Sequence, residues 1–201
     1  MKMPVSKLPI VGELSKLEKE KLRFKQVKYA RIRDVTKSGV IEEFDEYEYL
    51  FPVPKGAYTM PQRQRKVEKN DLLVVRNPGS LGKVGIIKED FDGEFVTDGF
   101  LVIRFPDNFI RGLNSEECTL LFSTLFRMQS VLKQMWYSQR EAVQPDNKVE
   151  TLKERVVIPV PIDSFVQQRL IQWAREHEKL NQEIVQKHHE LEHVWDEFFK
   201  I

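Results

Sequence analysis

VQQRLIQWAREHEKLNQEIVQKHHELEHVWDEF, from Val166 to Phe198, is the most regular run in the sequence. Its apolar residues recur with alternating steps of four and three residues, a heptad repeat that predicts one α-helix with a narrow apolar seam. An isolated helix would leave this seam in water, so we expect a second helix to cover it, either from the full protein or from a second copy of this chain, with a homodimer favoured. The expected dimerisation positions are Val166, Leu170, Trp173, His177, Leu180, Ile184, Leu191, Val194 and Phe198, with Lys187 as a second polar interruption beside His177.

The same run contains His189-Glu190-Leu191-Glu192-His193, which matches the zinc-hydrolase pattern H-E-x-x-H. In the heptad, His189 and His193 fall on the outer face, away from the seam. A catalytic zinc also needs a third ligand, and only Asp196 and Glu197 follow before the chain stops. We therefore expect a surface role for the histidines, no catalytic residue and no metal centre, and leave weak adventitious metal binding open.

Composition describes an ordinary folded chain of 201 residues, 41% hydrophobic and 31% charged, with a net charge of +1. No apolar run approaches the ~18 residues of a membrane helix, and no signal-peptide core is present, so we expect a cytoplasmic protein without a membrane partner. The single cysteine, Cys118, fits that compartment and a small buried role. Positive charge is concentrated from Lys55 to Lys88, where eight cations face two anions, which is compatible with a polyanionic ligand.

The order of elements predicts an α+β fold in three parts. Residues 1–25 form a charged, helical lead-in, with the helix expected over 12–25. In residues 26–162, short β-branched and aromatic runs predict strands at 27–35, 47–53, 71–77, 83–88 and 95–105. A helix is then expected over 115–139, with Ser115 as its N-cap. A polar loop over 140–150 and a strand over 154–162 follow. The long helix occupies 163–201. The expected fold is therefore a mixed or antiparallel β-rich domain with flanking helices, followed by a coiled-coil helix.

One turn in the β-rich part has a composition suited to phosphate. A strand ends at Arg76-Asn77, passes through Pro78-Gly79-Ser80-Leu81-Gly82 and re-enters a strand at Lys83. Glycines allow a close backbone approach, and backbone N–H groups with nearby cations bind phosphate. The turn does not match the P-loop pattern, so a plain hairpin turn remains the alternative.

Several stretches, in this order, resemble one family. They are YARIRDVTKSGVI (29–41), KVEKNDLLVVRNPGSLGKVGII (66–87), FVTDGFLVIR (95–104), the Leu/Phe-rich helix at 118–137 and LKERVVIPVPIDSFVQQRLIQWA (152–174). The series resembles the specificity subunit of type I restriction-modification systems over roughly residues 26–200. Asn70-Asp71 departs from the usual Gly-Asp. A full subunit has two recognition domains and two long helices, so this chain resembles a half-subunit or a fragment of a longer protein.

The resemblance implies a function in recognising double-stranded DNA without catalysis. The recognition domain would read one half of a bipartite target, and the long helix would act as a spacer. Adenine methyltransferase subunits, which bind S-adenosylmethionine, and possibly a restriction subunit would be partners, so no cofactor is expected in this chain. Arg pairs with guanine and Asn or Gln with adenine. The expected DNA-contacting residues are Tyr58, Gln62, Arg63, Gln64, Arg65 and Lys66 in one loop, Arg31, Arg33, Thr36, Lys37 and Ser38 in a second, and Arg76, Asn77, Ser80 and Lys83 in the third.

Two other readings stay open at this point. The chain could be the C-terminal recognition domain of a larger single-chain N6-adenine methyltransferase, or a coiled-coil protein-interaction module whose β-rich part binds protein. The DNA target sequence does not follow from the residues in either case.

Overall fold

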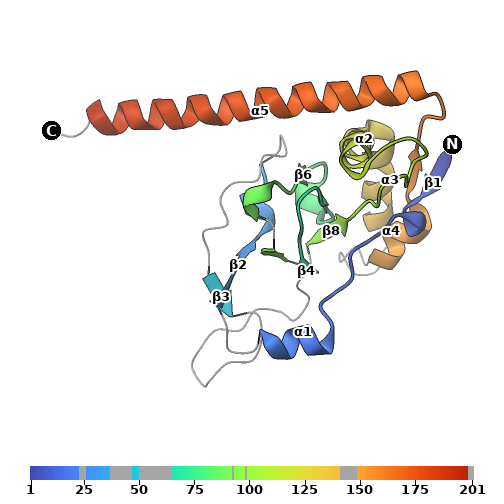
Figure 1. Cartoon of the computed structure of the whole chain (residues 1–201), viewed down its shortest axis with the longest axis horizontal. Helices are drawn as coiled ribbons and strands as arrows, with labels where there is room; N and C mark the ends of the chain where they lie inside the picture. The colour runs from blue at the N-terminus through green and yellow to red at the C-terminus, as the bar shows by residue number, and fades with distance from the viewer. Residues whose placement is uncertain are drawn as a thin grey trace.

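The computed structural model describes residues 1–22, 26–36, 47–49, 65–91, 93–97, 99–140 and 149–198. The longest helix, α5 (Ser164–Phe198), runs along one side of a head formed by the other elements, and its C-terminal end projects past that head (Figure 1). Helix α2 lies next to α5, whereas the short helix α1 lies on the opposite side of the head (Figure 1). Within the described residues, no helix is both long and apolar enough to cross a membrane.

The N-terminal residues belong to the head. Strand β1 (Lys2–Pro4) pairs antiparallel with β9 (Val157–Pro159), and the 3₁₀ turn η1 (Val5–Lys7) follows. Val5 and Leu8 lie in the main core. Helix α1 (Lys16–Lys21) starts at Ser15, which forms a capping box with Glu18. The expected helical lead-in over 1–25 is thus wrong for residues 2–7, because their alternating apolar side chains complete a sheet and a core.

Two small sheets pack together in the head. The first is antiparallel, in the order β6 (Val84–Ile86), β5 (Leu72–Val75), β8 (Phe100–Ile103). The second has the order β3 (Tyr47–Tyr49), β2 (Gln26–Ala30), β7 (Phe95–Val96), β4 (Arg65–Lys66), and β2 runs parallel to β7. Alternate residues of β5 enter different cores, which explains why the whole strand is apolar.

The run 95–105, expected as one β segment, is split between the sheets. Strand β7 belongs to the second sheet and β8 to the first. The 3₁₀ turns η2 (Ile32–Asp34), η3 (Pro78–Ser80) and η4 (Glu89–Phe91) link other strands. The predicted hairpin between 71–77 and 83–88 is confirmed as the antiparallel pair β5–β6.

The helical part of the head differs from the sequence expectation at three points. The expected helix over 115–139 is two helices, α2 (Ser115–Arg127) and α3 (Gln129–Arg140), separated at Met128, whose ψ of 135° is extended. The N-cap is Asn114 and not Ser115, since the Asn114 side chain accepts from the Glu117 amide at 2.8 Å. Part of the expected polar loop is helix α4 (Val149–Arg155). Cys118 is buried, as expected.

Candidate nucleic-acid interface

Two of the three predicted DNA-contacting loops, η2 and the η3 turn (residues 77–83, which contain η3), are joined by a side-chain hydrogen bond. The Lys83 ammonium Nζ donates to the carbonyl oxygen of Ile32 at 3.1 Å. The Arg76 amide, just before η3, donates to the carbonyl oxygen of Gly99 at 3.1 Å. Three segments distant in sequence therefore meet at one junction, which consists of η2, the η3 turn and Gly99.

Gly99 allows this junction to close. A Cβ atom added at position 99 would lie 2.4 Å from Cδ1 of Ile32 and 3.6 Å from Oδ1 of Asn77. The first distance is shorter than any van der Waals contact, so a side chain at position 99 would displace Ile32 from its place. The Ile32 side chain packs against the core between the two sheets.

Within η2, Asp34 organises the backbone and an exposed cation. Its Oδ2 accepts from the Arg31 amide at 2.7 Å, and its Oδ1 lies 3.4 Å from Nε of Arg33. The Arg33 side chain is 61% exposed, so it can reach a ligand in solvent. Thr36 is half-buried, whereas Lys37 and Ser38 lie outside the described residues.

The η3 turn has an open, glycine-rich edge. Gly79 has no atom within 4 Å of the place where a Cβ would stand, and Gly82 has a φ of +92° with Leu132 of α3 packed against it. A hollow of about 400 Å³ is lined by Gly79, Ser80, Leu81, Gly82 and Lys83. Asn77 is exposed, whereas Arg76 and Ser80 are half-buried. The predicted Gly-containing turn is present, and the close approach of a ligand to it stays a prediction.

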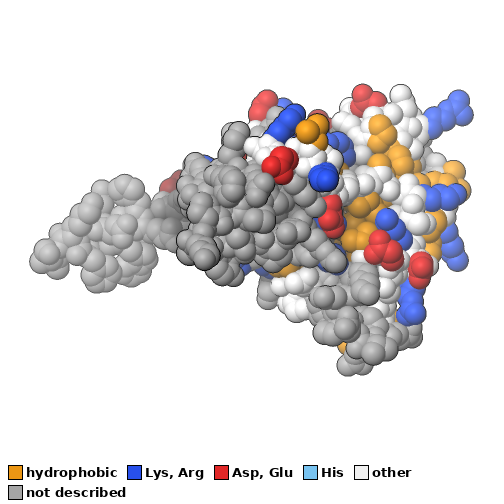
Figure 2. All heavy atoms as spheres, turned by 90° about the horizontal axis from the view of Figure 1, so that it is seen from below, with side chains coloured by type: hydrophobic (Ala, Val, Ile, Leu, Met, Phe, Trp, Pro, Cys, Tyr) orange, Lys and Arg blue, Asp and Glu red, His pale blue; other side chains and the backbone are white. Residues whose placement is uncertain are grey.

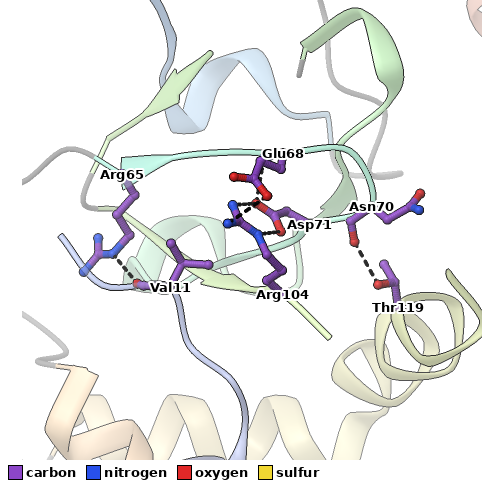
Figure 3. Close-up of polar contacts among 7 residues, drawn as sticks. All are labelled: Val11, Arg65, Glu68, Asn70, Asp71, Arg104 and Thr119. Carbon is purple, nitrogen blue, oxygen red and sulfur yellow. Dashed lines mark hydrogen bonds and ion pairs between the residues drawn. The ribbon is translucent and has the colours of Figure 1, made fainter. Parts of the chain in front are cut away.

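The predicted reading loop at 56–66 is described only at its end. Tyr58, Gln62, Arg63 and Gln64 lie outside the described residues, so their role stays a prediction. Lys66 is exposed. Arg65 is only 7% exposed, and its Nε donates to the carbonyl oxygen of Val11 at 3.2 Å (Figure 3). This burial gives Arg65 a structural contact and makes it a poor candidate for touching a base.

An ion pair between Asp71, just before β5, and Arg104, just after β8, was not predicted from the sequence. Asp71 is fully buried and accepts from Nε and from Nη2 of Arg104, both at 2.8 Å, and from the Glu68 amide at 2.8 Å (Figure 3). Arg104 also lies 2.9 Å from Glu68 Oε2. Burial raises the pKa of Asp71, while the hydrogen bonds from Arg104 and Glu68 act in the opposite direction.

Asn70 explains the departure from Gly-Asp noted in the sequence. Its φ is +69°, in the left-handed region that glycine favours and that asparagine tolerates better than most residues. Its carbonyl oxygen accepts from the Thr119 hydroxyl at 2.8 Å, which ties the turn before β5 to α2 (Figure 3). The residue before Asp71 therefore needs an unusual backbone conformation, and either Gly or Asn supplies it.

Helix α5 carries two adjacent stripes, one buried against the head and the other largely exposed. Gln167, Ile171, Ala174 and Asn181 are buried, and α5 contacts α2. The predicted seam lies one residue away around the helix and is largely exposed. Its exposed fractions are 42% at Val166, 55% at Trp173, 58% at Leu180, 56% at Ile184 and 56% at Leu191, whereas Leu170 and His177 are half-buried.

The polar seam position His177 is held by its neighbours. Its Nδ1 lies 3.0 Å from Nδ2 of Asn181, and its ring lies 6.2 Å from that of Trp173. Burial, followed by the charge of Arg127, lowers the pKa of His177. The side chains of His189, His193, Val194 and Phe198 lie outside the described ones, so the expectations about them stay predictions; among the described residues no cluster of three metal-ligating side chains occurs.

Charge alone does not mark an interface on the face away from α5. In that view, the described Lys and Arg side chains are interspersed with apolar patches and with acidic side chains (Figure 2). The case for the junction therefore rests on its geometry, namely the hydrogen bonds from Lys83 to the Ile32 carbonyl and from the Arg76 amide to the Gly99 carbonyl.

Comparison with known proteins shows similarity in structure. No protein-family model and no curated protein matches the sequence. The HsdS subunit from Thermoanaerobacter tengcongensis matches 98% of this chain with a TM-score of 0.59 and 13% identity. A chain from a study of complex assembly and conformational transition of the type I R-M system matches 98% with a TM-score of 0.57 and 19% identity. This chain covers 46% and 45% of those two chains. It thus has an HsdS-like fold and spans less than half the length of each solved chain.

Proposed function

We propose that this chain is a non-catalytic DNA-recognition module of a type I restriction-modification assembly, which reads one half of a bipartite target. The single observation that carries the proposal is the HsdS-like fold over 98% of the chain. The paired turns η2 and η3, with exposed Arg33 and Asn77 at one junction, support it independently of that likeness.

Contacts to phosphates and contacts to bases would be made by different residues. Phosphate contacts position a protein on DNA, whereas contacts to base edges supply sequence specificity. Arg33 and the open edge of η3 suit phosphate, because they offer an exposed guanidinium and a backbone that can be approached closely. Gln62, Arg63 and Gln64 are the side chains with the donor and acceptor pairs that base edges require.

The exposed seam of α5 would pair with a second long helix. That helix would come from another copy of this chain or from the other half of a longer protein. Adenine methyltransferase subunits, which would hold S-adenosylmethionine, would dock on the resulting assembly, with a restriction subunit as an optional further partner. The catalytic chemistry would then reside in those partners.

Salt dependence of DNA binding tests the proposal. Fluorescence anisotropy with a labelled mixed-sequence 30-base-pair duplex should give affinity that falls steeply as salt rises, because each neutralised phosphate releases counterions. A panel of duplexes should then show preference for one bipartite sequence. Undetectable binding, or affinity independent of salt, would contradict DNA recognition and favour the reading of α5 and the head as a protein-interaction module.

The second candidate is that this chain forms the C-terminal recognition domain of a larger single-chain N6-adenine methyltransferase. The two candidates differ in assembly. Sedimentation of the chain with a separate adenine methyltransferase should reveal a stable complex in the first case and none in the second.

A further inference from the structure

The sequence predicts that Lys83 binds phosphate, whereas in the structure its ammonium group makes a hydrogen bond within the protein. Its ammonium donates to the Ile32 carbonyl, which lies 51 residues away in the chain, and the contact is partly buried. A hydrogen bond from a charged donor is stronger than one between neutral groups, and partial burial makes its loss expensive.

We infer that Lys83 is a positioning residue that fastens η2 onto the end of the η3 turn (residues 77–83), so that the two turns approach DNA as one preformed unit; the DNA part of this inference rests on the proposed function. The single residue Ile32 is held at both ends. Its carbonyl oxygen accepts from Lys83, and its side chain fills the space that Gly99 leaves open. The exposed Arg33 follows directly in sequence, so its position is set by the same two contacts.

Holding η2 in place before DNA binds would reduce the conformational entropy that is lost on binding. A loop that is ordered only on contact with its ligand loses conformational freedom at that moment, which weakens affinity. A preformed junction avoids that loss. Lys83 would then affect DNA affinity without neutralising a phosphate itself, whereas Arg33 would contribute its charge directly.

The distinction is measurable because the two roles differ in salt dependence. A phosphate contact that is lost lowers the slope of log K against log salt by about 0.9, whereas a lost positioning contact leaves the slope unchanged. We expect Lys83→Met, which keeps the length of the side chain, to weaken binding of the mixed-sequence duplex about fivefold with the slope of the wild type. Arg33→Gln, the matched control at the same junction, should reduce the slope by about 0.9.

Gly99→Ala provides a second test without any change of charge. The added Cβ would press on Ile32, so this variant should reproduce the loss of affinity and the unchanged slope of Lys83→Met. Thermal melting establishes that each variant is folded. Backbone hydrogen exchange of the free proteins should also become at least fivefold faster at Asp34 and Val35 in Lys83→Met, because the contact that fixes η2 is gone.

The outcomes separate this inference from the proposed function. If Lys83→Met reduces the salt slope by about 0.9, Lys83 contacts phosphate and the inference fails while DNA binding stands. If hydrogen exchange at 34 and 35 is unchanged in Lys83→Met, the junction is not fastened by this contact. If the wild type does not bind duplex DNA at all, the proposed function fails, and the exchange experiment still decides whether Lys83 positions η2.

Discussion

Replacing Arg104 by Met removes the cation that faces the fully buried Asp71, and the consequence should depend strongly on pH. Breaking a buried ion pair by removing one partner costs about 3–5 kcal/mol of unfolding free energy. Arg104 is 38% exposed, so solvent already screens part of the pair, and we expect about 3 kcal/mol at pH 7. Such a loss is a large share of the stability of a domain.

Protonation of Asp71 sets an upper limit to this loss. The ordinary pKa of its carboxyl group is 3.8. Holding it neutral at pH 7 costs about 4 kcal/mol, and at pH 5 about 1.6 kcal/mol, at 1.36 kcal/mol per pH unit. Burial raises the pKa of Asp71 and Arg104 lowers it, so the variant has the higher folded-state pKa. Its folded state therefore binds a proton more readily than the wild type does, and its deficit must grow as pH rises from 4 to 7.

Urea unfolding of wild type and Arg104→Met at pH 5, 6 and 7 measures both quantities. Glu68→Gln is the control, because the Glu68 side chain is 49% exposed and its ion pair with Arg104 should contribute less than about 1 kcal/mol. A deficit under about 1 kcal/mol at pH 7, or an equal deficit at pH 5 and pH 7, would refute the account of Asp71 as a buried carboxylate that depends on Arg104.

Three further predictions concern backbone conformation and the seam. Asn70→Gly should raise the melting temperature by the equivalent of about 0.5–1 kcal/mol, since the φ of +69° is natural for glycine. Gly82→Ala should lose about 1 kcal/mol in urea unfolding because its φ is +92°, whereas Gly79→Ala, at an open position, should lose none. Leu180→Asp should leave the melting temperature of the monomer unchanged and abolish helix pairing in analytical ultracentrifugation, whereas Ile171→Asp, which places a charge in the core, should unfold the protein.

The sequence predicted those elements whose determinants are local. The β5–β6 hairpin followed from two apolar runs around a Gly-containing turn, and the heptad spacing predicted α5 and its seam. The break at Met128 could not be foreseen, because nothing in the run Leu125–Val131 disfavours a helix. Two tertiary contacts flank the break: Arg127 donates to the Val84 carbonyl at 2.5 Å, and Val131 is fully buried.

The sequence predicted which types of residue line the candidate site, but it did not predict which of them form hydrogen bonds within the protein. Lys83 and Arg65 are cations in a basic segment, and a sequence cannot tell a solvent-facing cation from one bonded to a carbonyl 51 or 54 residues away. The sequence also did not predict which stripe of α5 packs on the head. Two of its buried members, Gln167 and Asn181, are polar, so the pattern of apolar residues indicated only the neighbouring seam.

The two stripes of α5 fix how the head sits relative to any partner helix. Adjacent residues on a helix are about 100° apart, so a helix that covers the seam must lie beside the head rather than opposite it. The head buries α5 side chains from Gln167 to Asn181, and beyond Asn181 those described up to Leu191 are exposed apart from half-buried Val185. The helix continues to Phe198, about 25 Å further at 1.5 Å per residue. Since the described side chains of that length are exposed apart from Val185, it would set the distance between this head and whatever a partner helix carries without altering the fold of either.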